Sequence, residues 1–188
     1  ESVLKRLINF VERVLKEYKK EVTIGLVAKY VDNSDTYLSV TEALKSAAWG
    51  QKSEVNIRCI NAETATEADF AGVDGILVPG GFGTRGIEGK IAAAEYCIKN
   101  NKPYLGLCLG LQTAVIAAAR LGGVKKASSE EFGAGEAENV IYIMDGQQGK
   151  QSTGGTMRLG DYPAKLIEGT KTANLYGVTS VIERHRHR

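Results

Sequence analysis

The stretch Leu105-Gly106-Leu107-Cys108-Leu109-Gly110-Leu111-Gln112 places a cysteine between two glycines at the end of an apolar run. Residues 102–105 before it predict a short buried strand, and residues 113–121 after it predict a helix because they are rich in alanine and aliphatic side chains. A strand, a Gly-x-Cys-x-Gly turn and a helix in this order are typical of a nucleophile elbow. Such a turn aims the thiol at the helix N-terminus, where free N–H groups favour a thiolate.

The same stretch has a simpler interpretation, because free cysteines are often plain core residues. Cys108 could be a buried thiol in a glycine-containing turn between a strand and a helix. The elbow therefore needs a second feature before it indicates catalysis.

The second feature is the string Pro79-Gly80-Gly81-Phe82-Gly83, which directly follows an apolar strand. Consecutive glycines let backbone N–H groups turn toward a ligand without interference from a Cβ. This favours an oxyanion hole, although an ordinary turn between a strand and a helix is also rich in glycine. A phosphate loop is disfavoured because the Gly-Lys-Ser/Thr ending is missing. Acyl transfer needs both a nucleophile and an oxyanion hole, so the two glycine-rich turns together indicate an enzyme.

Around these turns, strand and helix patterns alternate. Strands are predicted over residues 21–28, 54–60, 74–78 and 102–107. Helices are predicted over residues 86–100 and 113–121, and a further helix between the first two strands ends near Trp49. This alternation predicts an α/β fold with a mostly parallel central sheet and helices on both faces. In the C-terminal part, residues 139–144 and 176–182 predict short strands, and residues 156–159 and 164–167 predict an antiparallel hairpin around a turn at 160–163.

Bulk properties exclude several classes of protein. A net charge of +2 does not suggest nucleic-acid binding, and no apolar run approaches the roughly 20 residues that span a bilayer. The three cysteines have neither a metal-site spacing nor a disulfide pattern, so we expect no metal and a reducing, cytoplasmic location. The chain begins with Glu1 rather than Met, and we expect that it has been cut from something longer.

The motifs resemble those of the class I (triad) glutamine amidotransferases and, within them, the glutaminase domains of the CTP synthase family, which imply a flavodoxin-like fold. The resemblance rests on four strings in family order: Val78-Pro79-Gly80-Gly81-Phe82-Gly83, Gly106-Leu107-Cys108-Leu109-Gly110-Leu111-Gln112, Gly154-Gly155-Thr156-Met157-Arg158-Leu159-Gly160 and Glu183-Arg184-His185-Arg186-His187-Arg188. It covers residues 21–188 as the glutaminase domain. Residues 1–20, an amphipathic helical stretch, resemble the connector that follows a synthetase domain.

The resemblance implies a role for each site residue. Cys108 would attack the side-chain amide of L-glutamine, and the backbone N–H groups of Gly81 and Leu109 would hold the oxyanion. Glutamine itself would be bound by Gly81 and Leu109 and by Gln112, Glu131 and Arg188. Glu131 would hold its amino group and Arg188 its carboxylate. Without the resemblance, Glu131 and Arg188 would be interpreted as solvated surface charges.

One part of the triad is missing. The family places its catalytic histidine and glutamate in a His-Pro-Glu string beyond the Arg-His-Arg-His-Arg segment, and this chain contains no such string. His185 and His187 are not assigned as the base, because the neighbouring arginines disfavour imidazolium formation. We therefore expect both catalytic partners of Cys108 to be absent, and this chain alone to be inactive or poorly active.

The resemblance also implies partners. Ammonia from glutamine would pass to a synthetase domain that aminates UTP to CTP, and ATP and Mg²⁺ would bind there rather than in this glutaminase domain, which needs no cofactor. The intact enzyme would serve pyrimidine biosynthesis as a homo-oligomer, with a tetramer expected.

Two alternatives stay open. One is a non-catalytic, regulatory amidotransferase-like domain, and the missing histidine is the argument for it. The other is a cysteine hydrolase of the same superfamily, such as a peptidase or a γ-glutamyl hydrolase. The string Gly154-Gly155-Thr156-Met157-Arg158-Leu159-Gly160 argues against this hydrolase.

Overall fold

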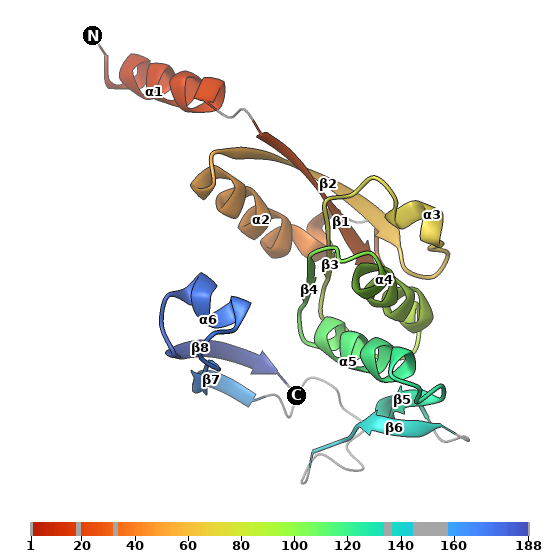
Figure 1. The fold of residues 1–188 in the computed structure, drawn as a ribbon. Helices are drawn as coiled ribbons and strands as arrows, with labels where there is room; N and C mark the ends of the chain where they lie inside the picture. Colours follow the sequence, from red (N-terminus) through yellow and green to blue (C-terminus); the bar gives the residue numbers. More distant parts are fainter. Residues whose placement is uncertain (1, 18–19, 32–33, 134–136, 145–157, 188) are drawn as a thin grey trace. The chain divides into compact units, whose positions relative to one another are not determined.

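The computed structural model describes residues 2–17, 20–31, 34–133, 137–144 and 158–187 (Figure 1). Two units make up the chain, Glu1–Tyr142 and Ile143–Arg188, here called unit 1 and unit 2. The predicted boundary between residues 20 and 21 is a different division and stays a prediction. Within the described ranges, no helix is both long and apolar enough to cross a bilayer.

Unit 1 alternates helices and strands as the sequence predicts. Its elements are α1 Val3–Glu17, β1 Lys20–Ala28, a 3₁₀ turn Ser34–Tyr37, α2 Leu38–Gly50, β2 Ser53–Asn61, α3 Glu67–Phe70, β3 Gly75–Val78, α4 Ile87–Lys99, β4 Tyr104–Gly106, α5 Leu109–Leu121, β5 Ala127–Ser129, a 3₁₀ turn Glu130–Phe132 and β6 Glu138–Ile141. The central sheet has four parallel strands in the order β2-β1-β3-β4. Strands β5 and β6 form a separate parallel pair.

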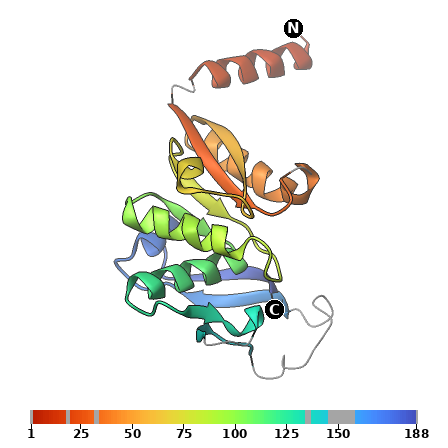
Figure 2. The same ribbon diagram turned by 90° about the vertical axis from the view of Figure 1, so that its right-hand side faces the viewer.

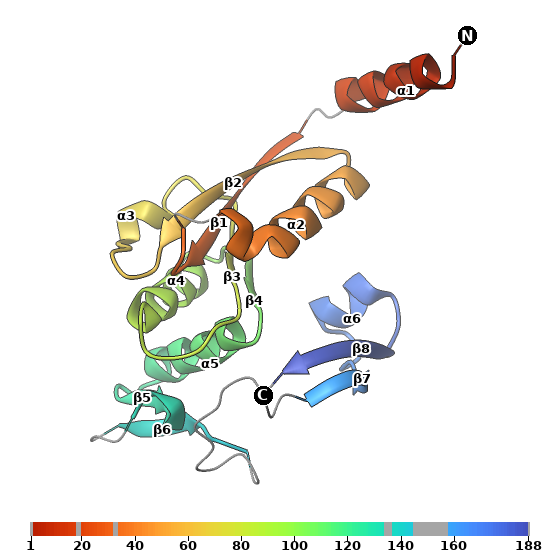
Figure 3. The same cartoon turned by 180° about the vertical axis from the view of Figure 1, so that it is seen from behind.

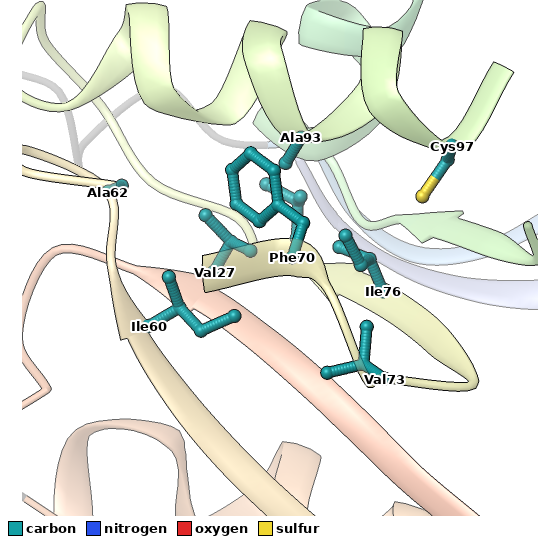
Figure 4. Packing of buried hydrophobic residues seen from close by; sticks show 9 residues of the cluster. Val27, Ile60, Ala62, Phe70, Val73, Ile76, Ala93 and Cys97 are labelled. Atoms are coloured by element: carbon teal, nitrogen blue, oxygen red, sulfur yellow. The ribbon is translucent and has the colours of Figure 1, made fainter. Parts of the chain in front are cut away.

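Helices cover both faces of the central sheet, which confirms the predicted architecture (Figures 1 and 3). Successive residues of a strand point to opposite faces, and β1 shows this in its buried end. Leu26 and Ala28 pack with Leu77 and with partly buried residues of α2. Val27 packs on the other face with Phe70 of α3 and Ala93 of α4 (Figure 4).

The strand order places a crevice where a site is expected. The chain leaves β1 in one direction to form β2 and later returns to the other side of β1 to form β3. In open parallel sheets, ligands bind at the carboxyl ends of the strands beside such a reversal. Here those ends are Ala28 and Val78, and the glycine-rich string begins at Pro79. Helices α4 and α5 run side by side beneath this region (Figure 2).

The first helix is amphipathic, as predicted, and the described side chains of its apolar stripe are not buried. The side chains of Val3, Leu4, Leu7, Ile8 and Val11 are all exposed. Its role as a connector stays a prediction.

Unit 2 contains β7 Arg158–Lys165, α6 Lys171–Tyr176 and β8 Ser180–His187. The two strands pair antiparallel, which confirms the expected antiparallel strands in the C-terminal part. The predicted hairpin around residues 160–163 is wrong, because these residues continue β7 and its partner is β8. Pro163 faces Ile182 within a two-stranded sheet, where the missing N–H of proline is tolerated because each strand has a free edge.

Two further boundaries differ from the predictions. The predicted strand over residues 176–182 is wrong in its first half, because Tyr176 ends α6, Gly177 is the C-cap residue of that helix, and the strand begins at Ser180. Helix α5 begins at Leu109 rather than at residue 113, so Cys108 is its N-cap residue. The helix therefore starts directly at the predicted nucleophile.

The close approach of α4 to the end of β2 gives a stability prediction. A Cβ at Gly89 would lie 2.0 Å from the carbonyl oxygen of Ala62, so Gly89→Ala must displace backbone. We expect the free energy of unfolding to fall by about 3 kcal/mol in urea denaturation, which is the upper range for overpacking.

The matched control is Gly50→Ala at the end of α2, where nothing lies within 4 Å of the added methyl group. This variant should gain up to about 1 kcal/mol from helix propensity. Equal stability of the two variants would contradict the assigned packing.

Candidate active site

The elbow at Cys108 is a sharp turn with a strained backbone. Cys108 has φ 53° and ψ −109°, which is a left-handed conformation that non-glycine residues rarely adopt. The first turn of α5 closes on it, because the N–H groups of Leu111 and Gln112 donate to the carbonyl oxygen of Cys108 at 3.0 and 3.2 Å. Such strain costs about 1–3 kcal/mol and is typical of active sites.

Close packing against β3 forces this turn. A Cβ at Gly110 would lie 2.1 Å from the carbonyl oxygen of Val78, and a Cβ at Gly106 would lie 2.4 Å from the backbone of Gly110. Glycine is therefore required at both positions for steric reasons. Beneath the turn, the Tyr104 hydroxyl and the buried Thr113 hydroxyl both donate to the carbonyl oxygen of Gly110, at 2.7 and 2.9 Å.

The glycine-rich turn after β3 lies directly against the thiol. A Cβ at Gly80 would lie 3.8 Å from the Sγ atom of Cys108. The backbone N–H groups of Leu109 and Gly81 both lower the pKa of the thiol and so favour the thiolate. The structure thus brings Cys108, Gly81 and Leu109 together.

Several groups compete to set the pKa of the half-buried Cys108 thiol. Burial is the largest effect and raises the pKa, while the N–H groups of Leu109 and then Gly81 lower it. The carboxylate of Glu131 raises the pKa further, and the ammonium of Lys90 lowers it. The net result is a pKa above the ordinary value, so an additional proton acceptor or positive charge is needed to make a thiolate at neutral pH.

Glu131 lies at the same turn. It follows β5 in the 3₁₀ turn, where its own N–H donates to the Ser129 hydroxyl at 3.3 Å. Its exposed carboxylate accepts a hydrogen bond from the N–H of Gly83 at 3.0 Å. A negative charge is therefore held beside the glycine-rich turn, a position from which it could receive a cationic amino group.

The other two predicted ligands of glutamine are less defined. Gln112 is half-buried in the first turn of α5, four residues after Cys108 and so on the same side of the helix. Arg188 lies outside the described residues. Unit 1, which carries Cys108, contains no histidine in its sequence, since the two histidines of the chain are His185 and His187.

The sequence interpretation missed two lysines that contact this turn. Lys29, just after β1, donates from its Nζ to the carbonyl oxygen of Phe82 at 2.6 Å and so holds the turn in place. Lys90 on α4 is only 1% exposed, although lysine is almost never buried without a partner. A signal for Lys90 was present, because it occurs on the apolar face of α4 between Ile87 and Ile91.

A cleft of about 410 Å³ lies beside the turn, between it and the first residues after β1. Its lining includes Lys29, Tyr30, Tyr37, Gly81 and Phe82. Cys108 and Glu131 are not among the lining residues, so the cleft and the thiol are separate features of the same turn.

Comparison with known proteins identifies relatives. The family model "Glutamine amidotransferase class-I" matches residues 33–188. The chain is 52% identical to the CTP synthase of Methanoculleus marisnigri, covering 93% of this chain and 33% of the relative. It is 51% identical to the CTP synthase of Caldanaerobacter subterraneus subsp. tengcongensis, covering 100% and 36% respectively. The chain thus spans about a third of the length of these curated relatives.

A solved structure is also similar. The Trypanosoma brucei CTPS glutaminase domain with bound acivicin superimposes with a TM-score of 0.79 at 36% identity. The match covers 89% of this chain and 67% of that structure.

The strain at the elbow can be measured with two variants that both remove the thiol. Cys108→Gly should be more stable than Cys108→Ala by about 1 kcal/mol, because glycine adopts φ 53° without strain but loses more backbone entropy on folding. Urea denaturation of both variants measures this difference. A less stable glycine variant would contradict the strained turn.

The burial of Lys90 gives a prediction about pH. Burial, followed by the nearby Lys29, lowers the pKa of Lys90 from 10.5 to about 8 in the folded protein. The unfolded state therefore binds more protons between pH 8 and 10.5, and this group adds stability as the pH rises through that window. We expect Lys90→Met to be roughly 3 kcal/mol more stable than the unchanged chain below pH 8.

This advantage should disappear by about pH 10.5, the unfolded-state value for lysine. Tyr104 and Cys97, whose pKa values burial raises to about 12 and 11, are present in both proteins and cancel in the comparison. Denaturation at a series of pH values checks this, and a stability difference that is independent of pH would contradict it.

Proposed function

The chain belongs to the class-I glutamine amidotransferase family, and from this premise we propose that it is the glutamine-hydrolysing domain of a CTP synthase. Cys108 is the nucleophile. Its thiolate attacks the side-chain amide carbon of L-glutamine, and a tetrahedral intermediate with a negative oxygen forms. Loss of ammonia leaves a glutamyl thioester, which water hydrolyses to glutamate.

The observation that carries this proposal is the position of the thiol, at the N-terminus of α5 and against the glycine-rich turn. The N–H groups of Leu109 and Gly81 act on the thiol there and lower its pKa. An oxyanion formed by attack of that sulfur develops within one bond of the attacked carbon, and so close to the same donors. Preorganised donors of this kind contribute about 3–4 kcal/mol each to transition-state stabilisation.

We propose that Glu131 holds the amino group of glutamine. Its carboxylate is already within hydrogen-bonding distance of the turn that carries Gly81, through the N–H of Gly83. Gln112, one helical turn after Cys108, is proposed to contact the substrate from the same side of α5. Arg188 stays a prediction as the group that clamps the glutamine carboxylate.

The proton acceptor for Cys108 is not assigned to unit 1, where no histidine occurs. The proposed mechanism needs a base that takes the thiol proton and returns it to the departing ammonia. That this chain lacks both catalytic partners of Cys108, and that it is weakly active alone, stay predictions.

The activity of the whole protein is proposed from its relatives. CTP synthases share 51–52% identity with the chain, and the chain spans about a third of their length. We propose that a synthetase domain receives the ammonia, binds ATP and Mg²⁺, and aminates UTP in pyrimidine biosynthesis. A cytoplasmic location is supported by the three free cysteines. The tetramer stays a prediction.

The two alternatives differ in how they account for the elbow. A regulatory, non-catalytic domain would retain the turn without using the thiol. A peptidase or γ-glutamyl hydrolase would use the thiol but transfer no ammonia, and the similarity to CTP synthases argues against it.

One variant separates these possibilities in the intact protein. Cys108→Ala should abolish CTP formation from UTP and ATP with glutamine but leave formation with added ammonium chloride unchanged, because the synthetase reaction needs only ammonia. Cys59→Ala, which removes an exposed thiol far along the sequence from the elbow, is the control and should retain both activities. Loss of both activities in Cys108→Ala would mean that the cysteine is structural. Retention of both would support the regulatory alternative.

A further inference from the structure

Lys90 is a buried cation for which the proposed reaction has no role so far. It lies on α4 among the buried residues Ile87, Ile91 and Ala94, and it is 1% exposed. Within the described part of the chain, it forms no ion pair with a carboxylate. Burying an unpaired charge costs several kcal/mol, so an ammonium in this place needs a compensating negative charge or a function.

The side chain of Lys90 places its ammonium group against the glycine-rich turn, beside Cys108. A Cβ at Gly81 would lie 3.7 Å from the Nζ atom of Lys90, and a Cβ at the preceding Gly80 would lie 3.8 Å from the Sγ atom of Cys108. The charge and the thiol therefore border two consecutive residues of one turn. Of these residues, Gly81 also lowers the pKa of the thiol through its N–H group.

We propose that Lys90 is a positioning residue for Cys108: the ammonium of Lys90 lies beneath the glycine-rich turn and favours the thiolate over the thiol. This deepens, and rests on, the proposed role of Cys108 as the nucleophile. The positive charge also favours the oxyanion that the same turn would hold. Because Lys90 is buried and Cys108 is half-buried, the interaction is screened less than it would be at the surface.

The charges around the pair are few. Glu131 opposes Lys90 at the thiol, and the N–H groups of Leu109 and Gly81 act with it. At the ammonium, the cationic Lys29 disfavours the charged form and the Cys108 thiolate favours it. Lys29 is already engaged with the carbonyl oxygen of Phe82. Lys90 is therefore the cation that stabilises the Cys108 thiolate from the buried side of the turn.

A purely structural role for Lys90 makes a different prediction. If only its aliphatic part matters, Lys90→Met keeps the packing and leaves the thiol unchanged. If the charge matters, the same substitution makes the thiol harder to ionise even though it relieves the cost of burial. The ionisation of Cys108 therefore separates the two roles, and overall stability does not.

The experiment measures the rate at which iodoacetamide alkylates Cys108 between pH 6 and 10 in the intact protein, followed by peptide mass spectrometry. Iodoacetamide is neutral and reacts with the thiolate, so the rate at each pH reports the fraction of Cys108 that is ionised. In Lys90→Met we expect a rate roughly tenfold lower below pH 8, where Lys90 of the unchanged protein is charged, and a rate that approaches that of the unchanged protein at higher pH, where Lys90 is neutral. Lys90→Arg should retain most of the original profile.

Two controls accompany the measurement. The exposed Cys59, followed in the same digests, should react at the same rate in every variant. Lys102→Met removes another partly buried lysine, whose charge acts on Cys97 rather than Cys108, and should leave the Cys108 profile unchanged.

An unchanged Cys108 profile in folded Lys90→Met would overturn the proposal. If this variant does not fold, as judged by circular dichroism, Lys90→Gln replaces it. Loss of folding in both neutral variants, with Lys90→Arg still folded, would make the charge structural and would also overturn the proposal. A shifted profile in a protein that does not hydrolyse glutamine would overturn the proposed function, while the effect of Lys90 on the thiol would stand.

Discussion

The site depends on how closely the first turn of α5 approaches the end of β3. The carbonyl oxygen of Val78 accepts a hydrogen bond from the N–H of Leu107 at 2.9 Å and leaves no room for a side chain at Gly110. Because the chain must reverse within this space, the residue between Leu107 and Leu109 takes a positive φ. Cys108 is therefore held at the helix N-terminus by packing that a larger residue at Gly110 would disrupt.

This constraint also explains why two distant strings of sequence form one site. Strands β3 and β4 are neighbours and parallel, so their carboxyl ends meet at the same edge of the sheet. The turn after β3 then borders the elbow after β4, and the N–H groups of Gly81 and Leu109 both lower the pKa of the thiol. The parallel sheet thus supplies the geometry, and the glycines permit the approach.

The sequence predicted this part of the fold well because the signals are local. Alternating strands and helices, and glycines at strand ends, follow from the patterns of short segments. It failed at Gly160 and Pro163, where residues typical of turns lie inside β7, because pairing with β8 outweighs local preference and a two-stranded sheet accepts proline at its edge. The sequence did not predict the early start of α5 because Gly110, in its first turn, has a low helix propensity.

The burial of Lys90 could not be predicted in the same way. A lysine on an apolar helix face usually extends its ammonium to water, and only the packing of α4 under the turn shows that this one does not. Burial raises the pKa of the thiol more than any neighbouring group does. Burial is also the condition that makes a nearby cation effective. The partial burial of Cys108 therefore creates both the need for a nearby positive charge and the environment in which the ammonium of Lys90 can supply it.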